Sequence, residues 1–403
     1  MPSTGNLKRT IVTKAARIAA VSMLAAAAVT HASEPPGLQV NEQGVLVKDG
    51  QAYRGIGVNY FNAFLRRLRD PADTSYREGF ATLAEKGIPF VRFAACGFWP
   101  VEWQLYLDDP DAYLTLLDDV VETAERTGVG LIPSLFWFNA CVPDIVGEPR
   151  SAWGDPSSKT SAFMRQYVER VVPRYIDSPA IWAWELGNEY DLAMDLPNAA
   201  EQRPYVHPHL GTPEERTEED DMTTEMVVTA SREFAQAVRQ HDPHRAITTG
   251  HSLPRPAAHH MHTEGTWTRD TREQFQQRLI LTHPSPIDLV SVHVYPFDPQ
   301  GRFDGETTYE EILSLAMAAC QREGKALFVG EFSAADVETH EGPLGPRHEN
   351  RVLLDAIVSS GVPLAAIWVF DLEQQADTFN ITPSNERAYL LDWVAEANKR
   401  MQR

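Results

Sequence analysis

Short apolar runs alternate with longer amphipathic segments along most of the chain. Eight of these runs are rich in Val, Ile, Leu and aromatic residues, and their unbroken apolar character is typical of strands buried on both faces of a sheet. The runs are RGIGVNYF from Arg54, PFVRFAAC from Pro89, GLIPSLFW from Gly130, AIWAWELGNE from Ala180, RAITTGHS from Arg245, IDLVSVHVYP from Ile287, KALFVGEFS from Lys325 and LAAIWVFD from Leu364. The pattern predicts parallel strands.

The segments between the runs have the spacing of amphipathic helices. AYLTLLDDVVETAERT, which ends before Gly128, and MVVTASREFAQAVRQ each carry one apolar stripe on a polar surface. Eight alternations of strand and helix, with no GxGxxG turn after the first strand, favour a closed barrel over an open doubly wound sheet. The predicted fold class is therefore α/β, a (β/α)8 TIM barrel.

Two additions to this barrel are expected. Leu38 to Tyr53 alternates in polarity around an Asp-Gly turn signal, which predicts a hairpin that plugs the barrel floor. A long insertion follows the fourth strand, from Tyr190 to about Asp221, and capping-box patterns that begin at Thr212 and Thr217 predict short helices in it. We expect the insertion to shape a substrate cleft; a passive surface loop is the alternative.

The first 32 residues have the pattern of a secretory signal peptide. Four basic residues precede a 12-residue apolar stretch from Ile18 to Val29, and small residues allow a cut after Ala32. A membrane-spanning helix needs about 20 apolar residues, so export to the periplasm or the medium is predicted, with an uncleaved anchor as the alternative. Residues 33–403 are then one barrel domain, without stable membrane association.

Acidic residues outnumber basic ones, 56 to 36, which gives a formal net charge of −20. Such a field repels polyanions, so nucleic acid, anionic membranes and acidic polysaccharides are excluded as expected partners. Cys96 and Cys141 follow neighbouring predicted strands, so a disulfide between them is one expectation. The alternative is that these two and Cys320 are all unpaired and pack as small apolar side chains. No motif indicates an oligomeric state.

Two glutamates end two of the apolar runs. Glu189 closes AIWAWELGNE and Glu331 closes KALFVGE, so both are predicted at the carboxyl ends of barrel strands, where barrel enzymes place their chemistry. Two carboxyl groups held together in this way are what cleavage of a glycosidic bond requires. Structural ion pairing is the alternative for both glutamates.

The motifs resemble those of retaining barrel glycosidases, most closely glycoside hydrolase family five. The resemblance covers Arg54 to Asp371 and depends on WELGNE with Glu189, GEF with Glu331, the HVYP segment, Arg92 and Trp368, which appear in the right strand order. VNYF and IDLVSVHVYP are similar to the β-mannanase branch of that family.

The resemblance implies that Glu189 is the acid/base and Glu331 the nucleophile, with no cofactor. Arg92 and Tyr295, if they converge on Glu331, favour its ionised form and leave the proton on Glu189. For Arg92, a structural pair with another carboxylate is the alternative to a contact with sugar.

The resemblance assigns sugar contacts to Asn188, which precedes the acid, and to Trp368 as a stacking platform. Asn188 and Glu189 are adjacent, so both can reach one sugar only if the strand has a local bulge. His293 and Tyr295 are two positions apart and face the same way, and a core histidine beside a wall tyrosine is the alternative for this pair.

The chain departs from the family at two places. Many members have a histidine at the end of the third strand, where this chain has Trp137 and Asn139, and Tyr190 replaces the common proline after the acid. These changes leave the two-glutamate chemistry intact and put the identity of the sugar in doubt. Trp137 is predicted to be a second platform, with core packing as an equal alternative.

Histidines cluster at two further places, and an HxH pair is a typical metal-binding pattern. Metal-dependent barrel hydrolases of the amidohydrolase type need such a pair on the first strand, which has none here. We therefore expect exposed loop histidines and no metal site. The clusters are His207 with His209, and His259, His260 and His262.

The leading functional hypothesis is a retaining hydrolase of β-glycosidic bonds in a neutral polysaccharide or oligosaccharide, with β-mannan first and β-glucan second. Two alternatives stay open: transglycosylation by the same two glutamates, and a carbohydrate-binding barrel without turnover.

Overall fold

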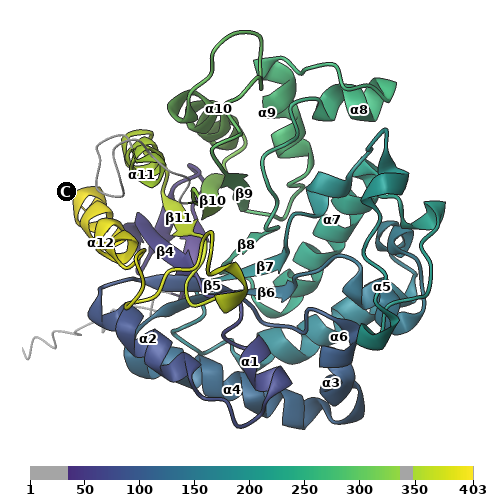
Figure 1. Ribbon diagram of the computed structural model, residues 1–403, viewed down its shortest axis with the longest axis vertical. Coiled ribbons are helices and arrows are strands. Elements are labelled where there is room, and N and C mark those ends of the chain that lie inside the picture. Colours follow the sequence, from purple (N-terminus) through teal and green to yellow (C-terminus); the bar gives the residue numbers. More distant parts are fainter. Residues whose placement is uncertain (1–34, 336–347, 403) are drawn as a thin grey trace, which may run out of the picture. The chain divides into compact units, whose positions relative to one another are not determined.

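Eight parallel strands close into a barrel in the computed structural model, which describes residues 35–335 and 348–402 (Figure 1). The order around the barrel is β10-β11-β4-β5-β6-β7-β8-β9, which is the order of the chain. The (β/α)8 prediction is confirmed, and each predicted run contains one strand. These strands are β4 (Gly55–Asn59), β5 (Phe90–Ala94), β6 (Gly130–Phe136), β7 (Ala183–Gly187), β8 (Ala246–Thr248), β9 (Leu289–Val294), β10 (Ala326–Phe332) and β11 (Leu364–Ile367).

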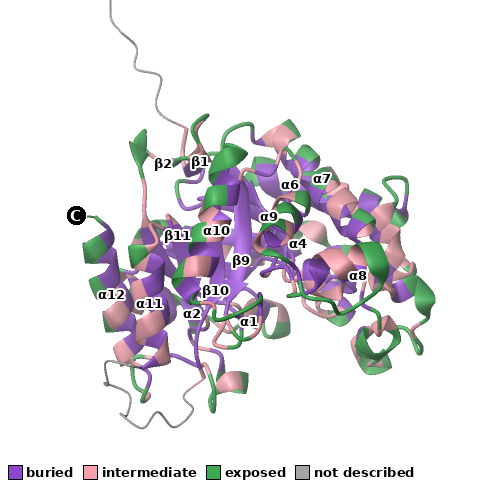
Figure 2. Ribbon diagram, turned by 90° about the horizontal axis from the view of Figure 1, so that it is seen from above, coloured by how far each residue is buried: buried purple, intermediate pink, exposed green. Residues whose placement is uncertain are grey.

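Helices surround the barrel strands, which Figure 2 shows as the buried centre of the molecule. The longest predicted helix, α4, begins after the N-cap Asp109, whose carboxylate accepts from the Ala112 amide, and ends at Gly128 in the left-handed conformation (φ 72°). The helices are α1 (Leu65–Arg69), α2 (Tyr76–Glu85), α3 (Gln104–Asp108), α4 (Pro110–Thr127), α5 (Cys141–Val146), α6 (Lys159–Arg174), α7 (Thr224–His241), α8 (Ala258–Glu264), α9 (Arg272–Leu281), α10 (Tyr309–Arg322), α11 (Glu349–Ser359) and α12 (Tyr389–Met401), with 3-10 turns η1 (Pro100–Trp103), η2 (Arg150–Gly154) and η7 (Glu373–Gln375).

A small antiparallel sheet precedes the barrel, as the Leu38–Tyr53 pattern predicted, although it has three strands instead of two. Leu38 and Leu46 pack with Phe90 and Phe328 at the amino ends of the barrel strands, and the Leu38 amide donates to the Trp182 carbonyl at 2.7 Å. The sheet therefore plugs the floor of the barrel and leaves the opposite end open. Its strands are β1 (Leu38–Val40), β2 (Leu46–Lys48) and β3 (Gln51–Ala52).

The insertion after β7 contains only short 3-10 turns: η3 (Tyr190–Ala193), η4 (Ala199–Gln202), η5 (Pro208–Leu210) and η6 (Glu218–Asp220). The capping box predicted at Thr217 is present and begins η6. The one predicted at Thr212 is wrong, because the Thr212 hydroxyl accepts from the His207 amide at 2.7 Å and no helix begins there.

The predicted signal peptide and its cut after Ala32 lie outside the described residues, and both stay predictions. Within residues 35–335 and 348–402, no helix is long and apolar enough to cross a bilayer. Cys96, Cys141 and Cys320 are all buried and unbridged, so of the two alternatives the structure favours unpaired thiols. Burial raises the pKa of the Cys96 thiol to about 12.

Candidate active site

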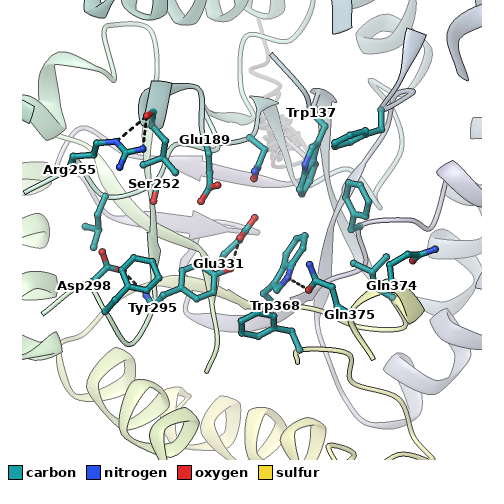
Figure 3. Close-up of a pocket in the computed structure, with 18 of the residues that line it drawn as sticks. Trp137, Glu189, Ser252, Arg255, Tyr295, Asp298, Glu331, Trp368, Gln374 and Gln375 are labelled. Carbon is teal, nitrogen blue, oxygen red and sulfur yellow. Dashed lines mark hydrogen bonds between the residues drawn. The ribbon is translucent and has the colours of Figure 1, made fainter. Parts of the chain in front are cut away.

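A cleft of about 920 Å³ opens at the carboxyl ends of the barrel strands. Glu189 and Glu331 face each other across its centre, as Figure 3 shows. Arg255 lies on one side of this pair, and Trp137 and Trp368 lie on the other. The cleft therefore extends in both directions from the two carboxyl groups.

Glu331 is almost fully buried near the end of β10, and each of its oxygens receives a hydrogen bond. Arg92 Nη1 donates to Oε1 at 2.8 Å, and the Tyr295 hydroxyl donates to Oε2 at 2.6 Å. The ladder between β10 and β9 shifts between Val329 and Glu331, so the strand is irregular where it delivers the carboxylate. Arg92 and Tyr295 thus converge on the carboxylate of Glu331, which is the arrangement that the sequence interpretation required.

Arg92 lies at the centre of a buried network on the barrel axis side of β5. Its Nε contacts both oxygens of Glu185, at 2.8 and 2.9 Å, while Nη1 also donates to Asn59 Oδ1 at 3.0 Å and Nη2 to Asn188 Oδ1 at 2.8 Å. Burial alone would lower the pKa of Arg92, but the carboxylates of Glu185 and Glu331 outweigh it and raise the pKa. Arg92 therefore forms the structural pair that was one alternative and also contacts the carboxylate of Glu331.

Glu189 is the second residue after β7 and has left-handed backbone angles, φ 53° and ψ 36°. The Asn188 amide donates to the Trp137 carbonyl at 3.0 Å on one side, and the Glu189 amide donates to the Gly250 carbonyl at 2.9 Å on the other. This turn brings both side chains to the cleft, so the expected bulge at this position is wrong. The left-handed backbone at Glu189 is a strained conformation, and strain of this kind is common at functional sites.

Burial raises the pKa of the Glu189 carboxyl above its ordinary value, and the charges of Arg92 and Arg255 oppose the shift. The side chain is still 29% exposed, so its carboxyl group is open to the cleft. Glu189 is thus the carboxyl group of the pair that burial favours in the protonated form.

His293 joins the two glutamates. Its Nδ1 lies 2.8 Å from Glu189 Oε1 and 3.6 Å from Glu331 Oε2. Burial lowers the pKa of His293 to about 3, so the ring is neutral near pH 7. One ligand atom from each of the three side chains lies within 4.8 Å of the others, a spacing that allows a metal ion; the expectation of no metal stays a prediction.

The same spacing bears on the type of reaction. Glu189 and Glu331 have oxygens within 4.8 Å of each other, which is well below the separation of about 6.5–9.5 Å that leaves space for a water molecule in inverting glycosidases. It is close to the carboxyl separation of about 5–5.5 Å that allows covalent capture of the sugar.

The two tryptophans form an aromatic wall of the cleft. Trp368 is partly exposed, its Nε1 donates to Gln375 Oε1 at 2.7 Å, and its ring lies 6.1 Å from that of Trp137. Trp137 is only 4% exposed and covers the Arg92 guanidinium at 4.4 Å, so it both lines the cleft and packs in the core. Core packing therefore holds for Trp137, which also lines the cleft, and the platform role of either ring stays a prediction.

Sequence reasoning missed three of these residues: Asn59, Glu185 and Arg255. Asn59 and Glu185 interrupt otherwise apolar runs and are fully buried, so a charged or amide side chain inside a buried strand was the available signal. Arg255 lies in a loop after β8, where no periodicity marks its direction.

The two departures from the family pattern lie mostly away from the cleft. Tyr190 is fully buried, and its hydroxyl donates to the Phe136 carbonyl at 2.7 Å. Asn139 Oδ1 accepts from Arg150 Nη1 at 3.3 Å, and the Asn139 carbonyl accepts from Trp153 Nε1 at 2.7 Å. Both side chains thus stabilise the protein beneath the site.

The histidines near position 260 are not exposed loop residues, and that expectation is wrong. His259, His260 and His262 lie on α8, half-buried. His260 Nδ1 lies 2.9 Å from Asp270 Oδ1, and His262 Nδ1 lies 3.1 Å from Asp195 Oδ2. Carboxylate partners therefore hold two of these rings against the insertion and the α8–α9 segment.

Comparisons with known proteins agree on the family. A family model described as cellulase (glycosyl hydrolase family 5) matches residues 51–371. Mannan endo-1,4-beta-mannosidase A of Emericella nidulans is 30% identical over 208 residues, which are 43% of this chain and 54% of that protein. A probable mannan endo-1,4-beta-mannosidase A-1 of Aspergillus terreus is 40% identical over 83 residues, 19% of this chain and 21% of that protein.

Among solved structures, the endo-1,4-beta-mannanase from Rhizomucor miehei has the same fold, with a TM-score of 0.64 at 15% identity. The similarity covers 91% of this chain and 99% of that one. The matches to the curated relatives span far less, from about a fifth to about half of their length.

Proposed function

The chain belongs to glycosyl hydrolase family 5, and from that membership we propose that it hydrolyses β-glycosidic bonds of a neutral polysaccharide or oligosaccharide with retention of configuration. β-Mannan is the first expected substrate and β-glucan the second. The observation that carries the proposal is the approach of Glu189 and Glu331 oxygens to within 4.8 Å at the centre of an open cleft.

In the first step, Glu331 attacks the anomeric carbon while Glu189 gives its proton to the departing glycosidic oxygen. The bond from the anomeric carbon to that oxygen breaks, and an ester between the sugar and Glu331 forms. Burial raises the pKa of the Glu189 carboxyl, which suits it to the role of proton donor, and hydrogen bonds from Arg92 and Tyr295 hold Glu331 in place for attack.

In the second step, the negative charge of Glu331 has been consumed by the ester, so Glu189 can lose its proton and act as a base. It removes a proton from water, the water oxygen bonds to the anomeric carbon, and Glu331 leaves as a carboxylate. A sugar hydroxyl in place of water gives transglycosylation.

The substrate class follows from the shape and charge of the cleft. It is lined by aromatic and apolar side chains together with polar ones, and two of its arginines, Arg69 and Arg302, are paired with carboxylates. The mannan-directed names of the relatives favour β-mannan over β-glucan. Secretion fits a substrate too large to enter a cell, and depends on the predicted signal peptide.

The test is a screen of the purified protein against β-mannan, β-glucan, xylan and aryl glycosides, with product sizing and NMR of the first-formed anomer. We expect release of β-configured products from mannan by the native protein and none by Glu331→Ala. First-formed α-anomers would exclude the retaining mechanism, and binding without release of any sugar would support the non-enzymatic alternative. In a parallel reaction with an added oligosaccharide acceptor, products that contain the acceptor, identified by mass, would indicate transglycosylation.

A further inference from the structure

A row of aromatic rings leaves the cleft and continues onto the insertion after β7. Phe61, which contacts Trp137, lies 5.9 Å from Phe98 between ring centroids. Phe98 lies 5.1 Å from Trp99, and Trp99 lies 5.5 Å from His207 of the insertion. We call Phe61, Phe98, Trp99, His207 and Tyr205 the aromatic track; its members come from the segments after β4, β5 and β7.

The outer end of the aromatic track is open to solvent. Tyr205 is 75% exposed, and its ring stacks on that of His207 with an interplanar angle of 26° and a centroid distance of 6.1 Å. Because His207 covers one face, the exposed area of Tyr205 includes the opposite face. An exposed ring joined to a cleft by further rings is more typical of a binding surface than of scattered surface hydrophobics.

The inner end is part of the cleft and is packed against a further ring. Phe98 and Trp99 both line the cleft. Phe138 supports them from behind, stacked on Phe98 at 5.1 Å with an interplanar angle of 6° and 5.6 Å from Trp99. Rings held in this way lose little conformational entropy when a ligand packs against them.

We propose that the aromatic track is a distal binding site for a neutral β-linked polysaccharide, which extends out of the catalytic cleft and over Tyr205. This inference rests on the proposed function, since it takes the same chain as the occupant of both sites. The C–H groups on the face of a pyranose are weakly positive and apolar, and they match the negative face of an aromatic ring.

Charge supports a neutral occupant. The insertion that carries Tyr205 also carries exposed acidic residues at positions 201, 214 and 215, and the protein has a formal net charge of −20. An acidic polymer would be repelled at this surface. Continuity with the cleft favours a glycan over a protein partner, because the rings form one path from the catalytic carboxyl groups to Tyr205.

The experiment compares long and short substrates in the variant Tyr205→Ala. We expect kcat/KM on soluble β-mannan to fall about three- to tenfold, as loss of an aromatic contact implies, while kcat/KM on an aryl mannoside stays unchanged. Tyr205→Phe keeps the ring and should keep the native rate. The matched control is Trp267→Ala, which removes a ring that is 53% exposed and outside the track.

Binding gives a second readout that does not need turnover. In affinity electrophoresis through gels of soluble β-mannan or β-glucan, the Glu331→Ala protein should be retarded. The double variant Glu331→Ala/Tyr205→Ala should bind the polysaccharide about three- to tenfold more weakly and so be retarded less. The double variant Glu331→Ala/Trp267→Ala should be retarded as much as Glu331→Ala alone.

The outcomes separate this inference from the proposed function. Unchanged activity and retardation in Tyr205→Ala overturn the aromatic track and leave the proposed function intact, and equal losses on long and short substrates also overturn it. If the native protein cleaves no glycan, the proposed function fails, and the affinity gels alone test the aromatic track. Retardation that depends on Tyr205 would then support the aromatic track, and retardation that does not depend on Tyr205 would overturn it.

Discussion

Glu185 and Arg92 form a fully buried ion pair, in which the Nε–H group of Arg92 is shared between the two carboxylate oxygens at 2.8 and 2.9 Å. Arg92 contacts Glu331 through a different nitrogen, Nη1. Glu185 therefore fixes the guanidinium from the side opposite to the Glu331 carboxylate, although it does not line the cleft itself. It is a positioning residue.

We predict that Glu185→Gln lowers the free energy of unfolding by about 1.5–3 kcal/mol, because the buried Arg92 loses one of its two carboxylate partners and keeps the other, Glu331. The matched control is Asp355→Asn, which breaks the exposed Arg400–Asp355 pair and should cost about 0–1 kcal/mol. Chemical denaturation monitored by tryptophan fluorescence measures both changes. Equal effects of the two variants would contradict the central role of the buried pair.

The roles of the two glutamates can be separated by the leaving group of the substrate. In Glu189→Ala, cleavage of a poor leaving group should slow by about 10²–10⁴-fold, because protonation of the departing oxygen is lost. An activated aryl glycoside needs little protonation, so its first step should survive while the second step becomes slow, and added azide should restore turnover by replacing the activated water.

Glu331→Ala supplies the contrast for that experiment. It lacks the nucleophile, so neither a better leaving group nor azide should restore cleavage with retention. Rescue of Glu331→Ala to a β-configured product, or a failure of azide to accelerate Glu189→Ala, would reverse or remove the assignment of roles.

The sequence predicted the barrel and the approach of Glu189 to Glu331 because both depend on local patterns. Apolar runs of strand length mark each barrel strand, and parallel strands in a closed barrel bring their carboxyl ends to one rim. Glu189 and Glu331, at the ends of two such runs, therefore had to approach each other. Their oxygens do so within 4.8 Å.

Features that depend on contacts between distant segments were not predictable in this way. The pairing of Glu185 with Arg92 joins residues 93 positions apart. The left-handed turn at Glu189 results from amide contacts to two different neighbouring loops. The same limit applies to the pairing of His260 and His262 with carboxylates, because a histidine cluster alone does not indicate which segments pack against it.

The basic limb of the pH profile should depend on Arg255. Glu189 acts first as an acid, and burial raises its pKa, so kcat/KM should fall as the pH rises through that raised pKa. The positive charge of Arg255 favours the ionised form of Glu189 and lowers its pKa. Its removal in Arg255→Gln should therefore raise the pKa of Glu189 and move the basic limb to higher pH.

Arg400→Gln is the control for the pH experiment, since this half-exposed arginine pairs with Asp355 and is not among the side chains that line the cleft. The profile of kcat/KM against pH for the three proteins checks the prediction. A basic limb that moves to lower pH in Arg255→Gln would show that Arg255 does not act on Glu189 through its charge.

The cluster of Glu189, His293 and Glu331 should make the enzyme sensitive to Zn²⁺ and independent of it for activity. His293 is neutral because burial lowers its pKa to about 3, and its Nδ1 and the two carboxylates approach each other within 4.8 Å, so they offer Zn²⁺ the ligands it prefers. A bound ion would hold both the proton donor and the nucleophile. We expect Zn²⁺ to inhibit competitively, EDTA to restore the rate, and EDTA alone to leave the native rate unchanged.

Mg²⁺ is the matched control, because it prefers about six oxygen ligands in octahedral geometry and should not inhibit at the same concentration. His293→Ala should raise the Zn²⁺ concentration needed for half-inhibition by about tenfold, relative to its own uninhibited rate, because one strong ligand corresponds to about 1.4 kcal/mol or more. Steady-state kinetics on a soluble substrate measures all of these effects. If EDTA inactivates the native enzyme and Zn²⁺ restores it, the metal takes part in the reaction, and the two-glutamate mechanism has to be revised to include it.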